Sequence, residues 1–202
     1  MPETDATSTD FASTSLARAA EVPVPQADAL AGRFPLTANP SPLAEDERAA
    51  VLRNLHFGNA FTDHMAHARW RQGEGWGDYG VIPYGSLSLS PAAAVLHYGQ
   101  EVFEGIKAYK REDGSVWTFR PGYNAARLNH SARRLALPEL SREDFVASLV
   151  DYVRADVKWV PDVDGSSLYL RPFMFASEEF VGVHPAGVVD YYVIGSPSGP
   201  YF

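Results

Sequence analysis

The feature that most constrains the fold is a hairpin signature in the middle of the chain. An extended run over residues 106–110 is followed by Asp113-Gly114 and by a second extended run over residues 115–119. Asp-Gly supplies the positive φ that a tight chain reversal requires. The sequence therefore predicts two antiparallel strands here, and with them a sheet.

Two helices are predicted directly after this hairpin. Pro121 stands at the first position of a helix that runs to about Leu137, and Ser141 begins the next, with Asp144 completing an S-x-x-D capping signature. The second helix carries an apolar residue at every fourth position, which is typical of a face packed on a core. These residues are Phe145, Leu149, Val153 and Val157.

Further strands are predicted before and after the helices, over residues 61–70, 81–90, 168–175 and 188–194. Strands, then two helices, then strands favour an antiparallel or mixed sheet with helices packed on one face. The predicted fold class is α+β, a two-layer sandwich over residues 41–195 whose first helix begins at Ser41-Pro42. Residues 1–40 are expected to form a mobile or extended N-terminal arm. Residues 196–202 have the composition of a linker.

Composition excludes several classes of protein. The chain of 202 residues suits one domain, and its net charge of −8 argues against nucleic-acid binding, which needs a basic face. No apolar run is long enough to span a membrane, and the acidic, polar start is neither a secretory signal nor a transit peptide. A cytoplasmic location follows as the simplest expectation. The chain has no cysteine and only three lysines, at positions 107, 110 and 158.

Three short motifs are interpreted as structural. Residues 75–80 fit G-x-G-x-x-G but no helix follows, so a hairpin loop is expected rather than a dinucleotide site. His64 and His67 are three apart on a predicted strand and so point to opposite faces. One buried and one solvated histidine are expected, without a shared metal ion. Residues 162–165 resemble the start of a calcium loop, but the glutamate at the twelfth position is missing, and a turn is expected.

Tyr169 and Arg171 are the residues that most clearly indicate a binding site. They are two apart on a predicted strand, so both side chains leave the same face. A phenol beside a guanidinium can bind a carboxylate through parallel hydrogen bonds. The alternative is a surface ion pair beside a packed tyrosine. Pro172, which follows, indicates a sheet edge or a bulge.

Arg127 lies inside the helix that Pro121 opens, where a cation gains nothing from the helix dipole. An anion such as a phosphate bound near the helix start would explain it, and a simple salt bridge is the alternative. Around Glu104-Gly105 lie three aromatic residues, Tyr98, Phe103 and Tyr109, for which core packing is the default interpretation.

Several segments, taken together and in order, resemble the branched-chain amino acid aminotransferases, which are fold-type IV enzymes that use pyridoxal 5'-phosphate. The resemblance covers the N-terminal part of that family and extends from about Phe57 to the last residue. The matching segments are residues 61–65, 96–98, 103–108, 119–121 with Asn124 and Arg127, 159–161, 167–172 and 199–202.

The resemblance implies a role for each matching residue. Arg127 resembles the arginine that binds the cofactor phosphate. Tyr169 and Arg171 resemble the pair that faces the substrate, where the arginine takes the distal carboxylate of glutamate. The remaining implied substrate-binding residues are Phe57 and Phe103 as apolar walls, Tyr98 and Val183 reaching the partner's pocket in a homodimer, and Tyr201 on the interdomain loop.

The implied reaction is amino transfer between leucine, isoleucine or valine and 2-oxoglutarate. The family's Schiff-base lysine is expected beyond Phe202, in an absent C-terminal domain, so the chain alone is expected to be inactive. Alternatives are a D-amino acid aminotransferase, an aminodeoxychorismate lyase, or a non-catalytic product that only binds or dimerises. The interpretation depends on Arg127 and the Tyr169–Arg171 pair converging on a shared cleft.

Overall fold

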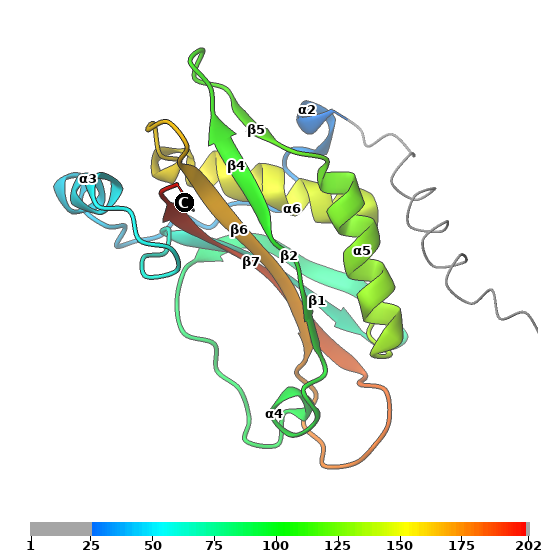
Figure 1. Cartoon of the computed structure of the whole chain (residues 1–202). Coiled ribbons are helices and arrows are strands. Elements are labelled where there is room, and N and C mark those ends of the chain that lie inside the picture. The colour runs from blue at the N-terminus through cyan, green and yellow to red at the C-terminus, as the bar shows by residue number, and fades with distance from the viewer. Residues whose placement is uncertain (1–25, 201–202) are drawn as a thin grey trace, which may run out of the picture.

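The computed structural model describes residues 26–200, and a seven-stranded sheet lies at its centre (Figure 1). The strand order is β2-β1-β7-β6-β4-β5, with β3 also pairing with β6, and every pairing between these strands is antiparallel. The strands are β1 His64–Arg71, β2 Gly75–Pro83, β3 Glu101–Phe103, β4 Ile106–Lys110, β5 Val116–Thr118, β6 Ser167–Ala176 and β7 Val188–Ser198.

The predicted hairpin is confirmed as β4 and β5. Ala108 pairs with Thr118 and Lys110 with Val116, and Gly114 in the connecting turn has a φ of 80°. The predicted glycine-rich loop at residues 75–80 is wrong, because Gly75 already begins β2 and pairs with Arg71. The G-x-G-x-x-G match therefore lies within a strand.

Both predicted helices are present, as α5 Pro121–Arg134 and α6 Arg142–Ala155, and they cover one face of the sheet (Figure 1). Ser141 caps α6 as predicted, because its Oγ accepts the backbone N–H of Asp144 at 2.9 Å. A short 3-10 helix, Val157–Trp159, follows. The predicted α+β class with a sheet layer and a helix layer is confirmed.

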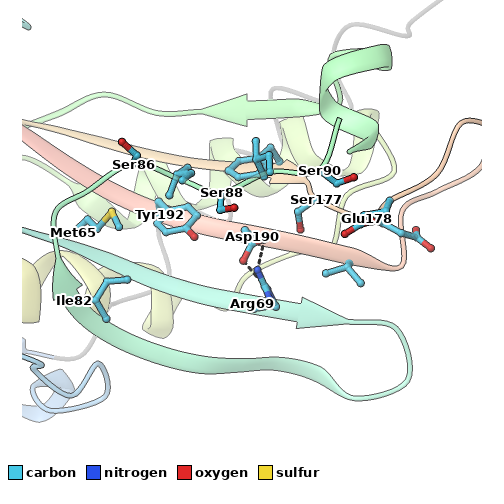
Figure 2. A pocket seen from close by; sticks show the side chains of 15 residues that line it. Met65, Arg69, Ile82, Ser86, Ser88, Ser90, Ser177, Glu178, Asp190 and Tyr192 are labelled. Carbon is cyan, nitrogen blue, oxygen red and sulfur yellow. Dashed lines mark hydrogen bonds and ion pairs between the residues drawn. The ribbon is translucent and has the colours of Figure 1, made fainter. Parts of the chain in front are cut away.

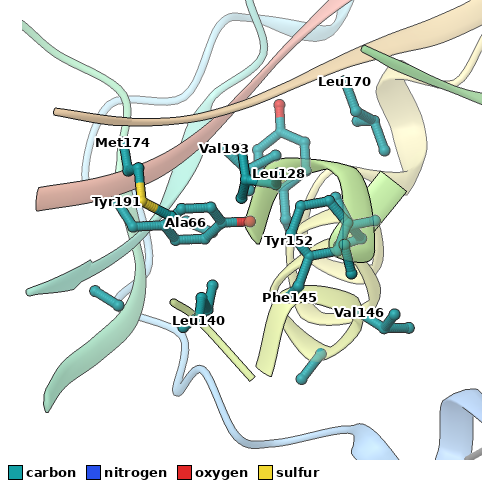
Figure 3. Packing of buried hydrophobic residues seen from close by; sticks show 14 of the residues in the cluster. Ala66, Leu128, Leu140, Phe145, Val146, Tyr152, Leu170, Met174, Tyr191 and Val193 are labelled. Carbon is teal, nitrogen blue, oxygen red and sulfur yellow. The ribbon is translucent and has the colours of Figure 1, made fainter. Parts of the chain in front are cut away.

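The core lies between the helices and the covered face of the sheet (Figure 3). Alternate strand residues point into it, since side chains on a strand alternate between faces. Tyr191 is fully buried there and its hydroxyl lies 2.9 Å from the hydroxyl of Ser148. Tyr152 of α6 is also fully buried, paired with the hydroxyl of Thr62. Its ring lies over Gly195, where a Cβ would clash with the phenol oxygen.

The described part of the N-terminal arm is held against α6. It contains the short helix α2, Ala27–Leu30, and the carboxylate of Asp151 accepts the backbone N–H groups of Gly32 at 2.8 Å and Phe34 at 2.9 Å. The Phe34 side chain is buried in the core. Residues 1–25 of the predicted arm lie outside the described residues.

Two further helices complete the fold, α3 Glu45–Arg53 and α4 Ala94–Tyr98. The predicted start of the first at Ser41-Pro42 is wrong, because α3 begins at Glu45 without a side-chain cap. Asp63 holds the chain just before α3, since its carboxylate accepts the backbone N–H of Leu43 at 2.8 Å. In the described residues no helix combines the length and the hydropathy that a membrane crossing requires.

His64 and His67 point to opposite faces of the sheet, but the expectation that one is solvated is wrong. His64 Nδ1 lies 2.7 Å from a carboxylate oxygen of Asp156, and His67 Nε2 lies 2.8 Å from one of Asp190. The two imidazole side chains are only 10% and 15% exposed. Within residues 26–200 no group of three side chains suited to hold a metal ion is found.

Candidate functional site

Tyr169 and Arg171 lie side by side on the open face of the sheet, which the helices do not cover. Their neighbours Leu168 and Leu170 point the other way, into the core. Arg171 Nη2 donates a hydrogen bond to the phenol oxygen of Tyr169 at 2.8 Å, and Nε lies 3.3 Å from the same atom. The predicted pairing of these two side chains is therefore present in the fold.

Two aromatic rings frame this pair. The guanidinium carbon of Arg171 stands 4.3 Å from the ring centroid of Phe103, a cation–π contact. Phe57 meets Tyr169 edge to face, with ring centroids 5.0 Å apart. Both phenylalanines are more than half exposed. One cation and two apolar rings thus share a solvent-accessible surface.

Arg127, on α5, forms a salt bridge with Glu104 on the helix-covered side of the sheet. Its Nε and Nη2 donate to the two carboxylate oxygens of Glu104 at 2.7 and 2.6 Å. Glu104 is 3% exposed, whereas the Arg127 side chain is half exposed. Asn124 donates a further hydrogen bond to Glu104 at 2.9 Å. The salt bridge that the sequence left open as an alternative is therefore present, and Nη1 of Arg127 takes no part in it.

A second arginine lies at the start of α5. Arg120 precedes the helix with a φ of 48°, an unfavourable conformation for a non-glycine residue. Its guanidinium carbon lies 5.6 Å from the ring centroid of Tyr123, and that of Arg127 lies 5.9 Å from the same ring. The helix has no side-chain cap and no acidic residue in its first turn. This end of α5 therefore presents two cations and uncapped backbone N–H groups, a donor set that suits an anion.

Residues 103–105 join these two groups of side chains. Because direction alternates along an extended chain, Phe103 and Gly105 face the open side and Glu104 faces the helices. Phe103 supports Arg171, Glu104 holds Arg127, and a Cβ on Gly105 would lie 2.5 Å from the phenol oxygen of Tyr169. The structure thus places Arg127 and the tyrosine–arginine pair on opposite sides of one edge segment, and the shared cleft expected from the sequence stays a prediction.

Tyr98 and Val183 come together at a separate hollow. Both line a cavity of about 380 Å³ with Leu135 and Pro185. The Tyr98 ring stacks on Phe180 at 6.3 Å between centroids, and Val183 is 95% exposed. Tyr201 lies outside the described residues.

The position of Lys107 on the open face was not predicted from the sequence. Lys107 pairs in register with Tyr169, so its side chain leaves the same open face as the tyrosine–arginine pair. Lys110 instead pairs with Asp162 at 2.9 Å, and Lys158 lies in the 3-10 helix. The period-two alternation of β4 could have placed Lys107 on that face once β4 was paired with β6.

A larger cavity, of about 540 Å³, lies further along the open face (Figure 2). Asp190, Arg69 and Tyr192 line it, and Arg69 donates to the Asp190 carboxylate at 2.8 and 3.0 Å. Burial opposes ionisation of Asp190, but the hydrogen bonds from His67 and Arg69 outweigh it and hold the carboxyl pKa well below its usual value. None of the predicted site residues within residues 26–200 lines this cavity.

Comparison with solved structures places the fold in a known class of domain. The Escherichia coli branched-chain amino acid aminotransferase matches with a TM-score of 0.51 and 27% identity, covering 67% of this chain and 41% of that chain. The T.th. branched-chain amino acid aminotransferase, solved with pyridoxamine 5'-phosphate, matches with a TM-score of 0.51 and 25% identity, covering 68% and 41%. The sheet and its helices are those of the N-terminal domain of these aminotransferases.

Sequence comparison agrees, although no family model matches the chain. The chain is 54% identical over 162 residues to the probable branched-chain-amino-acid aminotransferase of Streptomyces coelicolor, covering 80% of this chain and 45% of that protein. It is 51% identical over 170 residues to the branched-chain-amino-acid aminotransferase of Mycolicibacterium smegmatis, covering 84% and 46%. The chain is therefore homologous to the N-terminal part of the branched-chain-amino-acid aminotransferases, as its motifs predicted, and it spans less than half the length of these relatives.

Proposed function

We propose that the intact protein transfers amino groups between leucine, isoleucine or valine and 2-oxoglutarate, with pyridoxal 5'-phosphate as cofactor. The observation that carries this proposal is Arg171, whose guanidinium is hydrogen-bonded to Tyr169 and stacked on Phe103. This chain supplies the side-chain pocket of the substrate and part of the cofactor site. Its curated relatives carry the same activity in their names.

The arrangement suits two substrates that differ in charge. An aliphatic side chain packs against the rings of Phe57 and Phe103 and need not touch the cation. The distal carboxylate of glutamate or 2-oxoglutarate is taken by Arg171, whose planar group can donate two parallel hydrogen bonds. One pocket with apolar walls and a single arginine therefore serves both half-reactions.

The residues near the start of α5 fit the cofactor phosphate. Arg127 and Arg120 bring two positive charges to the ring of Tyr123, beside the uncapped N-terminus of the helix. Glu104 orients Arg127 and leaves Nη1 available to an anion. Pyridoxal phosphate, when bound, supplies the electron sink for amino transfer. The T.th. relative was solved with pyridoxamine 5'-phosphate, which supports this cofactor class.

The proposal includes a homodimer and a cytoplasmic location. In the proposed homodimer, the exposed side chains of Tyr98 and Val183 reach the pocket of the partner subunit. Tyr201 belongs to a loop that closes over the substrate. The catalytic lysine is assigned to none of the three lysines of this chain. It belongs to the C-terminal domain of the intact protein.

Replacement of Arg171 in the intact protein tests the proposal. Arg171→Ala is expected to lower kcat/KM for 2-oxoglutarate and glutamate by about tenfold or more, since a charge-assisted hydrogen-bond pair contributes at least about 1.4 kcal/mol. Leucine is expected to lose much less, because its side chain needs no cation. Arg111→Ala, on the hairpin, is the matched control and should leave all three substrates unchanged.

Two outcomes contradict the proposal. Equal losses for leucine, glutamate and 2-oxoglutarate would mean that Arg171 is structural. Preferential turnover of D-amino acids, or lyase activity on aminodeoxychorismate, would assign the protein to another activity of the same fold.

A further inference from the structure

An aliphatic groove lies apart from the Tyr169–Arg171 pair and reaches the start of α5. It has a volume of about 470 Å³ and is bounded by α2, the tip of the β4–β5 hairpin, Pro121 at the start of α5, and α6. Its lining shares one chemistry, since branched aliphatic side chains from α6, β5 and the 3-10 helix cover most of it. These side chains are Val116, Val146, Leu149, Val150, Val153 and Val157.

The N-terminal arm begins at one wall of this groove. Ala27 and Asp28 of α2 line it, and Asp28 forms an ion pair across to Arg154 of α6 at 2.5 Å. Asp151, also on α6, binds the arm again through the backbone of Gly32 and Phe34. The chain that immediately precedes Ala27 therefore starts at the groove, anchored by contacts on both sides of α2.

The sequence before α2 has the right chemistry for this surface. It reads Val22-Pro23-Val24-Pro25, which is aliphatic and uncharged. Each valine precedes a proline and is therefore restricted to the β or polyproline II region, and each proline has a fixed φ. Gln26, which follows, has φ −59° and ψ 150°, the polyproline II conformation. Gln26, the described residue next to Pro25, thus has the conformation that the prolines favour.

Two properties of the segment Val22–Pro25 favour docking in the groove over exposure to water. A preformed extended segment loses little conformational entropy when it is ordered. Prolines have no backbone N–H, so half of the donors that would need a partner on an apolar surface are missing. Length is also sufficient, because four residues in polyproline II span about 12 Å. The α6 stretch from Val146 to Val153 is only roughly 10 Å long.

We propose that residues 22–25 dock in this groove as an intramolecular strap, with Val22 and Val24 against the valines of α6. The strap covers an aliphatic surface that the described residues leave open and fixes α2 to α6. It depends on no feature of the proposed active site, and it holds whichever reaction the intact protein catalyses.

Paramagnetic labelling in the 202-residue chain tests the strap. Because the chain has no cysteine, Ala20→Cys gives a single attachment point for a nitroxide next to the two valines. Methyl resonances of Val146, Val150 and Val153 are expected to broaden. Those of Val183, on the β6–β7 loop at the opposite end of the sheet, are expected to stay sharp (Figure 1).

Charge substitutions separate docking from simple tethering. Adding Val22→Asp and Val24→Asp to the labelled chain is expected to abolish the broadening at α6, because carboxylates are not tolerated on the aliphatic surface. The matched control, Thr7→Asp with Thr9→Asp, adds the same charge outside Val22–Pro25 and should preserve the broadening. Equal broadening in all three chains overturns the proposal.

Mixing labelled chains with unlabelled isotope-enriched chains gives the other decisive outcome, since broadening between molecules would mean that a second copy fills the groove. Unchanged amide shifts for β6 and β7 confirm that each variant is folded.

Discussion

Glu104 holds Arg127 through two parallel hydrogen bonds of 2.7 and 2.6 Å, although the two residues are 23 positions apart. The carboxylate is almost fully enclosed, while the guanidinium is half exposed. A buried anion thus fixes one edge of an arginine and leaves the other edge accessible. This geometry determines the direction in which the arginine can present its remaining N–H groups.

Glu104→Gln is predicted to destabilise the chain by about 1–2 kcal/mol, because an amide replaces a charge-assisted acceptor and leaves a poorly matched polar group buried. Urea unfolding at neutral pH measures the change. Glu101→Gln, an exposed residue of the neighbouring strand β3, is the matched control and should be nearly neutral. Equal effects at the two positions would show that the Glu104–Arg127 pair contributes nothing specific.

Gly105→Ala is predicted to displace the Tyr169 ring, because the new methyl carbon would lie 2.5 Å from the phenol oxygen. The hydrogen bond between Arg171 and Tyr169 should be lost, and overpacking should cost about 1–3 kcal/mol. Tyr169 ring resonances and urea unfolding report the two effects. Gly77→Ala is the control, since nothing lies within 4 Å of a Cβ there. An unmoved Tyr169 resonance in Gly105→Ala would contradict the prediction.

Local sequence rules predicted those parts of the fold that depend on neighbouring residues. The Asp-Gly turn, the Ser141 cap and the shared face of Tyr169 and Arg171 each follow from spacings of two or three residues. Contacts between distant segments were not predictable in this way. The edge-to-face pair of Phe57 and Tyr169 and the salt bridge of Arg127 depend on how the strands are ordered.

Two misjudged residues show why strand order matters. One of His64 and His67 was expected to be solvated, but His67 has a partner in Asp190, which lies 123 residues further along, on the adjacent strand β7. Pro172 was interpreted as a sheet edge or a bulge, yet β6 lies inside the sheet. The neighbouring strand is interrupted there instead. The pairing with β4 ends at Leu170, and that with β3 begins at Phe173, so no strand requires the missing N–H of Pro172.

The 202-residue chain is predicted to form no adduct with pyridoxal phosphate that borohydride can fix. Lys107 is the critical residue, because it leaves the same face as Tyr169. That face is open to water, which favours hydrolysis of any adduct with the cofactor aldehyde. Peptide mass spectrometry after reduction measures the outcome, with Lys107→Arg as the control. A stable adduct on Lys107 would overturn the assignment of the catalytic lysine to another part of the intact protein.

Asp190→Asn is predicted to make the free energy of unfolding less dependent on pH in the acid range. The folded-state pKa of Asp190 lies below its usual value, so the ionised carboxylate stabilises the fold at every pH above the unfolded pKa of about 3.9. This contribution is lost as the pH falls below that value towards the folded pKa. At about pH 7 the variant should therefore be less stable by about 2 kcal/mol or more, since His67 and Arg69 lose a charged acceptor.

The difference between the two proteins should shrink progressively below about pH 4, because protonation removes the same charge from the natural side chain. Urea unfolding at a series of pH values measures it. Asp78→Asn, at a half-exposed ion pair with Arg71, is the matched control and should show only a small difference at any pH. A stability difference for Asp190→Asn that stays constant down to about pH 3 would mean that shape rather than charge at this position stabilises the sheet.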